Sequence, residues 1–307
     1  MHTIDISDVD RDGWLHLRSR GIGGSDAAGI LGLSLWESPM SIWAAKTGRS
    51  EPKVLTFAMD MGNRLEPIVA ELAQDELGRE VTERQVMCID DEHDYLLGNV
   101  DRWLDPDAIL EIKTAGVRQI AAWEAGVPPY YEAQVRHYLM VTGRELGIVA
   151  VLLGGQELRT YEIARDPMYE DWMREAEIEF WEQHVVTDVP PPPDSAEATK
   201  KALARMYHGK KDTKVYATPE IESLLLLRDE KAKYLATIEA DIIGIDNAVR
   251  AFMCDNEILL GGPAAEVLVT WKSQIRRTVD TKALKEDQPE LAAKYMREST
   301  SRTFLVK

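Results

Sequence analysis

The pattern of apolar and polar positions predicts a mixed α/β domain in the first part of the chain. Residues 146–153, LGIVAVLL, are apolar throughout and predict a buried strand, with residues 157–163 as its partner strand. Two further strands are expected on either side of a turn at Asp105-Pro106-Asp107, with helices before and after them. These two strands cover residues 95–104 and 108–114, and the helices cover residues 14–33, 63–77, 130–142 and 167–185.

Residues at the expected helix ends support these boundaries. Residues 14–33 are expected to contain a turn that leads into a helix, and Ser25, which follows two glycines, is the expected N-cap of that helix. Asn63 precedes Glu66 by three positions, which is the spacing of a capping box. Gly143 is expected to end the helix 130–142, because glycine readily adopts the left-handed conformation that follows many helices.

A run of four prolines separates this domain from the rest of the chain. The segment DVPPPPD, residues 188–194, cannot lie inside a helix or a central strand and is typical of a stiff spacer. We therefore predict a domain of residues 1–189, a proline-rich linker of residues 190–215 and a C-terminal module of residues 216–307.

The C-terminal module is expected to begin with a long helix. Thr218 is a suitable N-cap, and Pro219 would occupy the first helical position. Apolar residues in this helix recur at alternating steps of three and four, as in a heptad seam; they are Ile221, Leu224, Leu235, Ile238, Ile242, Ile245, Val249 and Phe252. The same register also places two cations, Arg228 and Lys231, on the seam. The seam either packs against its own module or binds a partner.

The end of the chain is expected to form a small sheet. Val267–Trp271 and Arg302–Lys307 have strand-like apolar patterns and flank a helix near residues 281–296. The expected fold class is therefore an α/β core followed by a smaller α+β C-terminal module with a long helix.

Composition narrows the class of protein. Apolar residues make up 45% of the 307 residues, a share typical of domains with a packed core. The acidic N-terminus does not resemble a signal or transit peptide, and no run approaches eighteen apolar residues. Two distant cysteines, Cys88 and Cys254, favour neither a disulfide framework nor a structural zinc site. We therefore expect a cytoplasmic protein without a membrane span.

The net charge of −17 at first argues against a nucleic-acid partner, but the charge is unevenly distributed. Residues 196–307 contain 19 basic and 17 acidic residues, whereas residues 1–195 contain 17 basic and 36 acidic residues. An acidic domain can bind DNA if its basic groups line a groove, because an acidic outer surface steers the polyanion toward that opening. Net charge alone therefore does not decide whether the protein binds DNA.

The segment NVDRWLDPDAILEIKT, residues 99–114, contains the most informative chemistry. Glu111 and Lys113 are two positions apart, so on a strand they share one face, while Leu110 and Ile112 point to the other. If the two strands pair about a centre near residue 106, Asp101 lies opposite Glu111 on the same face. Two carboxylates and one lysine then lie close together on one face of the paired strands.

Phosphodiester hydrolysis needs such a cluster. Carboxylate oxygens hold Mg²⁺, which polarises the phosphoryl oxygen and lowers the pKa of a bound water. A lysine can orient or deprotonate the water and offset the charge that develops on phosphorus. For the triplet alone, the competing interpretation is a solvated hairpin face with a cross-strand ion pair.

The context of this triplet resembles the lambda-exonuclease/YqaJ family of viral recombination nucleases, within the PD-(D/E)xK nuclease superfamily. Five segments carry the resemblance in the family's order: WLHLRSRGIGGSDAAGILG (14–32), MGNRLEPIVAE (61–71), LLGNVDRWL (96–104), LEIKT (110–114) and PPYYEAQVRHYLMVTG (128–143). The ending of the chain is also similar to C-terminal modules of YqaJ-like phage proteins. The resemblance implies a restriction-endonuclease-like core, a mixed sheet flanked by helices.

The resemblance also implies roles for individual residues. Asp101, Glu111 and the backbone carbonyl of Ile112 would hold the metal, and Lys113 would be the catalytic lysine. Glu66 would be an outer ligand of a second metal, directly or through water, in place of or in addition to its capping role.

On the helix 130–142, Gln134 would position the attacking or a metal-bound water, and Tyr138 is a weaker candidate one turn later on the same face. The alternative for Gln134 is an ordinary polar helix position. The superfamily often has proline before the first aspartate, where this chain has Val100, and we expect no effect because that proline is not a ligand.

By the same resemblance, Arg18 and Ser25 would bind the 5′-phosphate of the DNA substrate. A guanidinium group matches the geometry of phosphate oxygens, and a serine at a helix N-terminus adds backbone N–H donors. The alternative for the glycine-rich segment is a simple capped turn, and Arg20 lies close enough in sequence to compete with Arg18.

The function implied is a Mg²⁺-dependent exonuclease, with Mn²⁺ as a substitute, that digests double-stranded DNA ends 5′→3′. It would leave 3′ single strands for a phage annealing protein, and a ring of subunits would make it processive. It would act as a phage or prophage protein in a bacterial host. The alternatives are an endonuclease or repair nuclease of the same superfamily, and a non-catalytic module that binds DNA ends.

Overall fold

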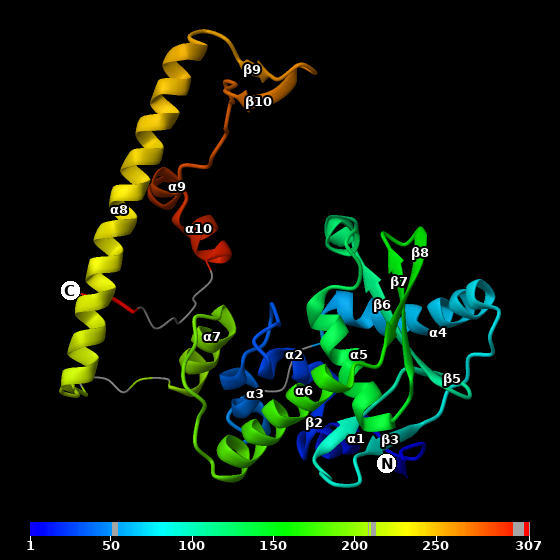
Figure 1. The fold of residues 1–307 in the computed structure, drawn as a ribbon. Coiled ribbons are helices and arrows are strands. Elements are labelled where there is room, and N and C mark those ends of the chain that lie inside the picture. The colour runs from blue at the N-terminus through cyan, green and yellow to red at the C-terminus, as the bar shows by residue number, and fades with distance from the viewer. Residues whose placement is uncertain (51–54, 208, 210–212, 297–303, 307) are drawn as a thin grey trace. The chain divides into compact units, whose positions relative to one another are not determined.

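The protein is described by a computed structural model that covers residues 1–50, 55–207, 209, 213–296 and 304–306. Its chain forms two compact units, Met1–His208 and Gly209–Lys307 (Figure 1). The first unit contains two mixed or antiparallel sheets flanked by helices, and the second combines a long helix with a two-stranded sheet and two short helices. The expected fold class is confirmed.

The central sheet of the first unit has the strand order β5-β6-β7-β8. Its strands are β5 (Arg102–Leu104), β6 (Ala108–Ala115), β7 (Leu146–Leu153) and β8 (Glu157–Ala164). Strands β6 and β7 run parallel, whereas β5 and β8 are antiparallel to their neighbours. The predicted bounds of the last three strands are correct to within one residue.

A second sheet has the order β1-β3-β4-β2. Its strands are β1 (His2–Asp5), β3 (Val86–Ile89), β4 (Leu96–Gly98) and β2 (Ile22–Gly23). The single strand predicted over residues 95–104 was wrong, because β4 and β5 belong to different sheets. The chain leaves the second sheet at Gly98 and joins the central sheet at Arg102, and Asp101 lies between them.

Helices surround these sheets (Figure 1). They are α1 (Arg11–Ser19), α2 (Gly24–Ile30), α3 (Pro39–Lys46), α4 (Phe57–Leu77), α5 (Pro129–Thr142), α6 (Pro167–Phe180) and α7 (Glu197–Met206). A 3₁₀ segment covers Val117–Trp123, and a π-helical segment, Trp181–Val186, continues α6. The parallel connection from β6 to β7 runs through α5, as expected for a crossover.

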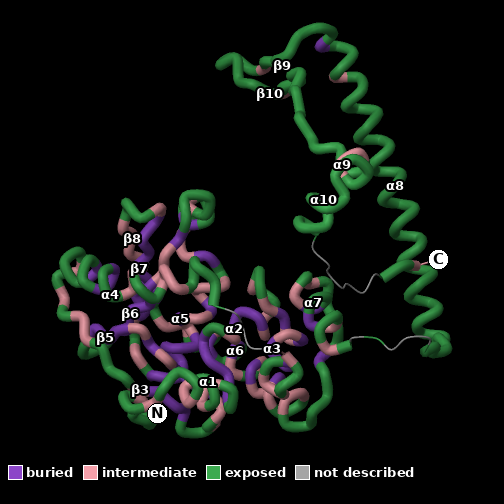
Figure 2. The backbone as a smooth tube through the Cα atoms, turned by 180° about the vertical axis from the view of Figure 1, so that it is seen from behind, coloured by how far each residue is buried: buried purple, intermediate pink, exposed green. Residues whose placement is uncertain are grey.

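The alternation of side chains along β6 divides the core into two layers. Leu110 and Ile112 pack with residues of α4 on one face of the central sheet. Ile109 packs on the other face, together with Leu139 of α5 and Val149 of β7. The central strands β6 and β7 are largely buried on both faces (Figure 2), and Glu111 is enclosed near the middle of β6.

Two expected helix starts were wrong. Helix α4 begins at Phe57, six residues before Asn63, and its N-cap is Thr56, whose hydroxyl accepts from the N–H of Met59 (3.3 Å). Asn63 therefore lies inside the helix, and Glu66 does not form a capping box with it. The N-cap of α2 is Gly23 rather than Ser25, and the Gly23 N–H donates to Asp26 Oδ2 (3.1 Å).

The range expected to be a linker contains a helix of the first unit. Residues 190–193 have no regular secondary structure, but α7 then packs against α3, and its Thr199 and Ala202 are buried. Thr199 Oγ1 donates to Ser38 Oγ, the N-cap of α3, over 2.8 Å. The first unit thus continues to residue 208 rather than 189, because apolar residues beyond the prolines return to the core.

The second unit is built around α8 (Pro219–Met253), which begins where the sequence predicts. Strand β9 (Ile258–Gly261) pairs antiparallel with β10 (Glu266–Thr270), so the partner of β10 is not the predicted closing strand. Of that closing strand, most residues lie outside those described, and 304–306 are not in a strand. The predicted helix 281–296 is two helices, α9 (Thr281–Asp287) and α10 (Pro289–Tyr295), because Pro289 starts a new helix.

Across the described residues, no helix combines the length and the hydropathy that a bilayer span requires.

Candidate active site

The hairpin formed by β5 and β6 has the register that the sequence predicts. Arg102 pairs with Leu110 and Leu104 with Ala108, so the pairing is centred on residue 106. This places Asp101, just before β5, opposite Glu111 on β6. Asp101 Oδ2 accepts from the N–H of Ile112 (2.8 Å), which ties the Asp101 carboxylate to β6 beside Glu111.

Glu111 is the centre of the site. Its side chain is almost fully buried, with the residue 1% exposed. Its Oε1 accepts from Lys113 Nζ and from Gln134 Nε2, the latter over 2.6 Å. Its Oε2 is buried and has no hydrogen-bond partner among the described residues. The carboxylate is therefore not on a solvated hairpin face, and a buried anionic oxygen without a partner is costly unless a cation binds it.

Burial and like charge shift the acidity of these carboxyl groups. Burial, followed by the neighbouring Glu111, raises the pKa of Asp101 to about 7. Burial also raises the pKa of Glu111, although the charge of Lys113 opposes the shift. Burial alone would lower the pKa of Lys113, but Glu111 and Asp101 more than offset it and raise that pKa. The lysine is thus held in its charged form beside two carboxyl groups that compete for protons.

Glu66 comes to the edge of this cluster from α4. Arg102 Nη1 donates to Glu66 Oε1 (2.7 Å) and to the backbone oxygen of Asp101 (2.6 Å), and its guanidinium lies 3.4 Å from Glu83. Burial and the charge of Asp101 raise the pKa of Glu66, so the two carboxyl groups are close enough to interact. The sequence analysis missed Arg102, although it directly follows Asp101 and its strand position faces α4.

The ion pair between Glu66 and Arg102 affects which carboxylates are available to bind a metal ion. In the described part of the chain, no group of three or more His, Cys, Asp or Glu side chains is close enough together to bind a metal ion. Asp101 and Glu111 nevertheless fit a hard cation, because both supply carboxylate oxygens and Glu111 Oε2 lacks any other partner. Arg102 occupies Glu66 Oε1, so Glu66 would join them through its other carboxylate oxygen or through water.

Helix α5 closes the site from the other side. Gln134 accepts from Lys113 Nζ at its Oε1 (3.2 Å), and its Nε2 lies 3.2 Å from the hydroxyl of Tyr138. Gln134 is therefore a member of the cluster rather than an ordinary surface position. The Lys113 ammonium also lies 4.9 Å from the ring centre of Tyr131, a contact that the sequence analysis missed although Tyr131 is one turn before Gln134.

The start of α2 packs directly on this helix. A Cβ atom at Gly24 would lie 2.6 Å from the Tyr138 ring and 2.9 Å from the backbone oxygen of Gln134, so only glycine fits there. This close approach fixes the segment that carries Ser25 relative to the catalytic cluster.

Arg18 and Ser25 are brought together. Arg18 Nη2 donates to Ser25 Oγ, and the same guanidinium lies 4.0 Å from Asp26 Oδ1. Lys46 Nζ donates to Asp26 Oδ2 (2.7 Å). Burial would raise the pKa of Asp26, but Lys46 and Arg18 overcome it and lower that pKa. Arg20 is exposed and takes no part in this cluster.

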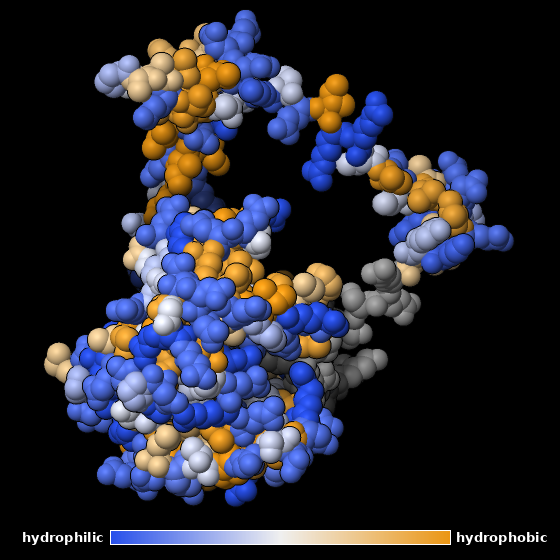
Figure 3. Space-filling model, turned by 90° about the vertical axis from the view of Figure 1, so that its right-hand side faces the viewer, coloured by the Kyte–Doolittle hydropathy of each residue, from blue (hydrophilic) through white to orange (hydrophobic). Residues whose placement is uncertain are grey.

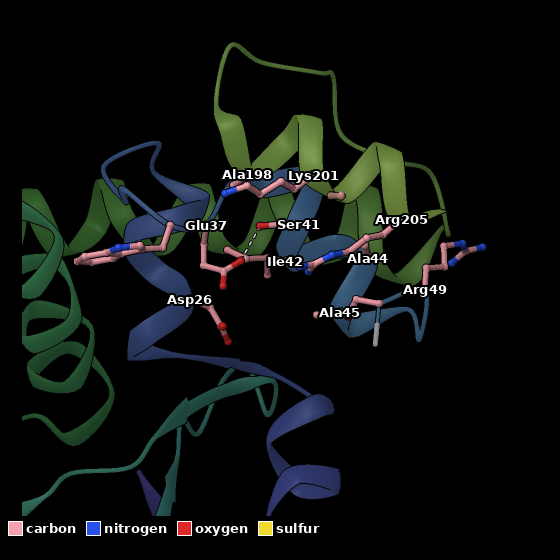
Figure 4. A pocket seen from close by; sticks show the side chains of 13 residues that line it. Asp26, Glu37, Ser41, Ile42, Ala44, Ala45, Arg49, Ala198, Lys201 and Arg205 are labelled. Atoms are coloured by element: carbon pink, nitrogen blue, oxygen red, sulfur yellow. Dashed lines mark hydrogen bonds between the residues drawn. The ribbon is translucent and has the colours of Figure 1, made fainter. Parts of the chain in front are cut away.

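A pocket of about 320 Å³ lies beside this cluster, between α2, α3 and α7 (Figure 4). Asp26 lines it from α2, and Lys201 and Arg205 line it from α7. Glu37 accepts from the Ser41 hydroxyl (2.7 Å) at its wall. The described lining contains three basic side chains, Arg49, Lys201 and Arg205, and two acidic ones, Asp26 and Glu37. Asp26 connects the pocket to the Arg18–Ser25 pair.

Comparisons with known proteins agree with this architecture. The family model of the YqaJ-like viral recombinase domain matches residues 13–145, a range that includes Arg18, Glu66, Asp101, Lys113 and Gln134. The alkaline exonuclease LHK-Exo from Laribacter hongkongensis, also solved in complex with dAMP, has the same fold. It is 18% identical, with a TM-score of 0.50 over 58% of this chain and 94% of that chain.

A relative in Bacillus subtilis (strain 168) is more similar in sequence. Its protein YqaJ is 33% identical over 313 residues, which cover 98% of this chain and 95% of that protein. The similarity thus extends through both compact units. On this evidence the chain belongs to the YqaJ-like viral recombinase family.

Proposed function

We propose that this protein is a Mg²⁺-dependent deoxyribonuclease that digests double-stranded DNA from its ends in the 5′→3′ direction. The observation that carries the proposal is the buried cluster of Asp101, Glu111 and Lys113, in which no described residue provides a hydrogen-bond partner for Glu111 Oε2. A structural ion pair would satisfy both carboxylate oxygens, whereas a hydrolytic site keeps one oxygen for a metal ion.

Asp101, Glu111 and the backbone carbonyl of Ile112 would hold the metal, with Glu66 as an outer ligand. A divalent cation supplies charge that polarises the phosphodiester and acidifies a water molecule, and Mn²⁺ would substitute for Mg²⁺. Arg102 holds Glu66 at the edge of the cluster, so it positions this outer ligand.

Lys113 and Gln134 would act on the attacking water. Lys113 keeps its proton, so its ammonium can donate to the water or to a phosphoryl oxygen as negative charge develops there. The Gln134 amide contacts both Glu111 and Lys113 and can fix the orientation of the water. Hydrolysis forms one bond from the water oxygen to phosphorus and breaks one P–O bond of the DNA backbone.

The pair of Arg18 and Ser25 would bind the 5′-phosphate. The guanidinium and the hydroxyl already share a hydrogen bond, and Lys46 neutralises the nearby Asp26, so a phosphate group would not face an uncompensated carboxylate. Binding a terminal phosphate here would set the polarity of digestion.

The biological setting of the proposal follows from the family. The product would be a 3′ single strand, passed to a single-strand-annealing protein during phage-type recombination in the cytoplasm of a bacterial host. A ring of identical subunits around the DNA would account for processive digestion.

The test uses linear duplexes labelled at either the 5′ or the 3′ end, beside a covalently closed circle. We expect Mg²⁺-dependent release of the 5′ label first, a protected 3′ strand and an intact circle, with no cleavage by Lys113→Ala protein. Rapid cutting of the circle would instead indicate an endonuclease of the same superfamily. Binding of ends without cleavage at any Mg²⁺ or Mn²⁺ concentration would indicate a non-catalytic end-binding module.

A further inference from the structure

Helix α8 exposes an apolar face along its whole length. Of its 35 residues, Pro219–Met253, only Met253 is buried. Ile245 is 65% exposed and Phe252 is 76% exposed. Figure 2 shows the helix exposed from end to end, and Figure 3 shows hydrophobic side chains of the second unit standing at the surface. Such a face is typical of a helix that binds a partner.

Part of this apolar surface follows a heptad repeat, and other exposed apolar residues, such as Leu226 and Ile243, lie outside it. Ten seam positions span residues 221–252, and eight of them are apolar. At 1.5 Å per residue this seam is about 47 Å long, and it exceeds four heptads, the length at which a repeat indicates a coiled coil. The two interruptions are Arg228 and Lys231, so the partner must accommodate these two cations.

The charges beside the seam indicate which partner fits. In the heptad register, Glu239, Asp241 and Asp246 flank the second half of the seam, and no basic residue flanks that half. The first half carries Arg228 and Lys231 within the seam itself. At the seam and its flanking positions, the first half therefore carries two cations and one acid, Glu220, whereas the second half carries three acids and no cation.

We propose that α8 pairs with α8 of a second copy of this chain in an antiparallel two-stranded coiled coil. The seam has two sets of positions, each repeating every seven residues, one from Ile221 and one from Leu224. With the twofold axis between Ala236 and Thr237, each position of the first set meets a position of the second set on the other helix, for example Ile221 with Phe252. Arg228 then lies beside Asp246 of the second copy.

A parallel pairing does not fit the same residues. It would place Arg228 against Arg228 and Lys231 against Lys231 inside the seam, and Asp241 near Asp246 at its flank. Like charges in such positions cost free energy, whereas the antiparallel pairing puts Lys231 beside Asp241 of the second copy. The charge pattern therefore selects orientation as well as partner.

The pairing would join two nuclease units through their second units. It does not depend on the catalytic proposal, because no residue of α8 belongs to the candidate site.

The first test is the mass of the full chain in solution, measured by light scattering or sedimentation at micromolar concentration. Replacing Ile242 and Ile245 with glutamate should lower the mass by a factor of two. Ile243→Glu is the matched control, since Ile243 is also exposed but lies off the seam. An unchanged mass for the seam variant, or an equal loss for the control, would overturn the proposal.

Cysteine cross-linking tests the orientation, in a Cys254→Ser background. A mixture of Ile221→Cys and Phe252→Cys proteins should form a disulfide-linked dimer, whereas Ile221→Cys alone should not. Cross-linking of Ile221→Cys with itself would show a parallel pair and reject the antiparallel one. DNA cleavage by these variants gives a separate readout, so loss of pairing is distinguishable from failure of the nuclease proposal.

A charge exchange tests the stated reason for the pairing. Arg228→Glu with Lys231→Glu should weaken dimerisation about tenfold or more, because each acid then meets an acid. Adding Asp241→Lys and Asp246→Lys should restore it. If the first pair of substitutions strengthens dimerisation, the antiparallel arrangement is wrong.

Discussion

The first unit buries charged side chains, whereas the second unit exposes apolar ones. Glu111 lies inside the central sheet of the first unit, and His137 and Glu177 are fully buried between its helices. In the second unit, the seam of α8 faces solvent while its charges form exposed pairs such as Asp229 with Lys233 (3.3 Å). Both arrangements cost free energy in an isolated chain.

This difference suggests that each unit is stabilised by a different kind of binding partner. A buried carboxylate with an unpartnered oxygen is stabilised by a cation, so we expect a bound metal ion to stabilise the first unit. An exposed heptad seam is stabilised by another helix, so the second unit is complete only with its partner. The predictions below test whether the two units differ in this way.

The largest effect is expected at Lys113, the proposed catalytic lysine. Lys113→Ala should reduce kcat by roughly 10²–10⁴, because it removes a group that acts on the water or on developing charge. Metal and DNA binding should stay within a few fold of the wild type, since Lys113 is not a ligand. Single-turnover cleavage and binding isotherms measure the two separately, and a variant with near wild-type turnover would remove Lys113 from the mechanism.

The buried pair of His137 and Glu177 should matter for stability rather than chemistry. His137 Nδ1 lies 2.9 Å from Glu177 Oε1 and its Nε2 lies 3.0 Å from the Leu97 oxygen, so both ring nitrogens face acceptors and both carry protons. Burial would lower the pKa of His137, but Glu177 raises it overall. Glu177→Gln should therefore cost about 3–5 kcal/mol of the free energy of unfolding, because it leaves a buried cation without its partner.

The matched control for that variant is in the second unit. Asp229→Asn breaks an exposed ion pair and should change stability by less than about 0.5 kcal/mol. Seven of the eight tryptophans lie in the first unit, so fluorescence follows its unfolding and circular dichroism follows both units. Equal losses in the two variants would contradict the contrast between buried and exposed charge.

A smaller effect is expected at the candidate 5′-phosphate site. The enzyme should prefer 5′-phosphorylated over 5′-hydroxyl duplex ends by about ten- to a hundredfold, from roughly 1.5–3 kcal/mol of charge-assisted hydrogen bonding. Arg18→Ala should erase most of this preference, and Arg20→Ala should not. Time courses on duplexes that differ only in the 5′ phosphate measure it, and equal rates for wild-type protein on both ends would reject the assignment.

The pH dependence of the metal-free protein tests the buried carboxyl pair. The pKa of Asp101 is about 7 in the folded state against an ordinary value of 3.8, so the folded state keeps this proton to higher pH. The free energy of unfolding should therefore fall as the pH rises from about 4 to about 7. Asp101→Asn cannot ionise, so it should lack this part of the slope and exceed the wild type most clearly above pH 7.

Repeating the pH series with Mg²⁺ tests whether Asp101 binds the metal ion. Added Mg²⁺ should restore wild-type stability at about pH 8, where Asp101 is ionised, and should have little effect on Asp101→Asn. Urea unfolding across the pH series, with and without Mg²⁺, gives both results. A wild-type slope identical to that of the variant would show that Asp101 is not the group that titrates.

Sequence predicted the local parts of the fold and site. The register of the β5–β6 hairpin and the shared face of Glu111 and Lys113 follow from a short turn and a period of two, which both act within a few residues. The helix carrying Gln134 was placed correctly because Gly143 ends it with a left-handed residue. The start of α4 was missed because Thr56 precedes a stretch with no strong apolar period.

Tertiary structure decided the contacts between distant segments. Arg102 and Glu66 are 36 positions apart, and His137 and Glu177 are 40 apart, so no local pattern connects them. The same is true of α7, whose burial against α3 brings residues beyond the prolines back to the first unit. By itself the sequence determined which residues could perform the chemistry and which helix has a seam. Only the folded chain decided that Glu111 keeps one oxygen without a partner, because burial and long-range packing, rather than residue type, remove water from that atom.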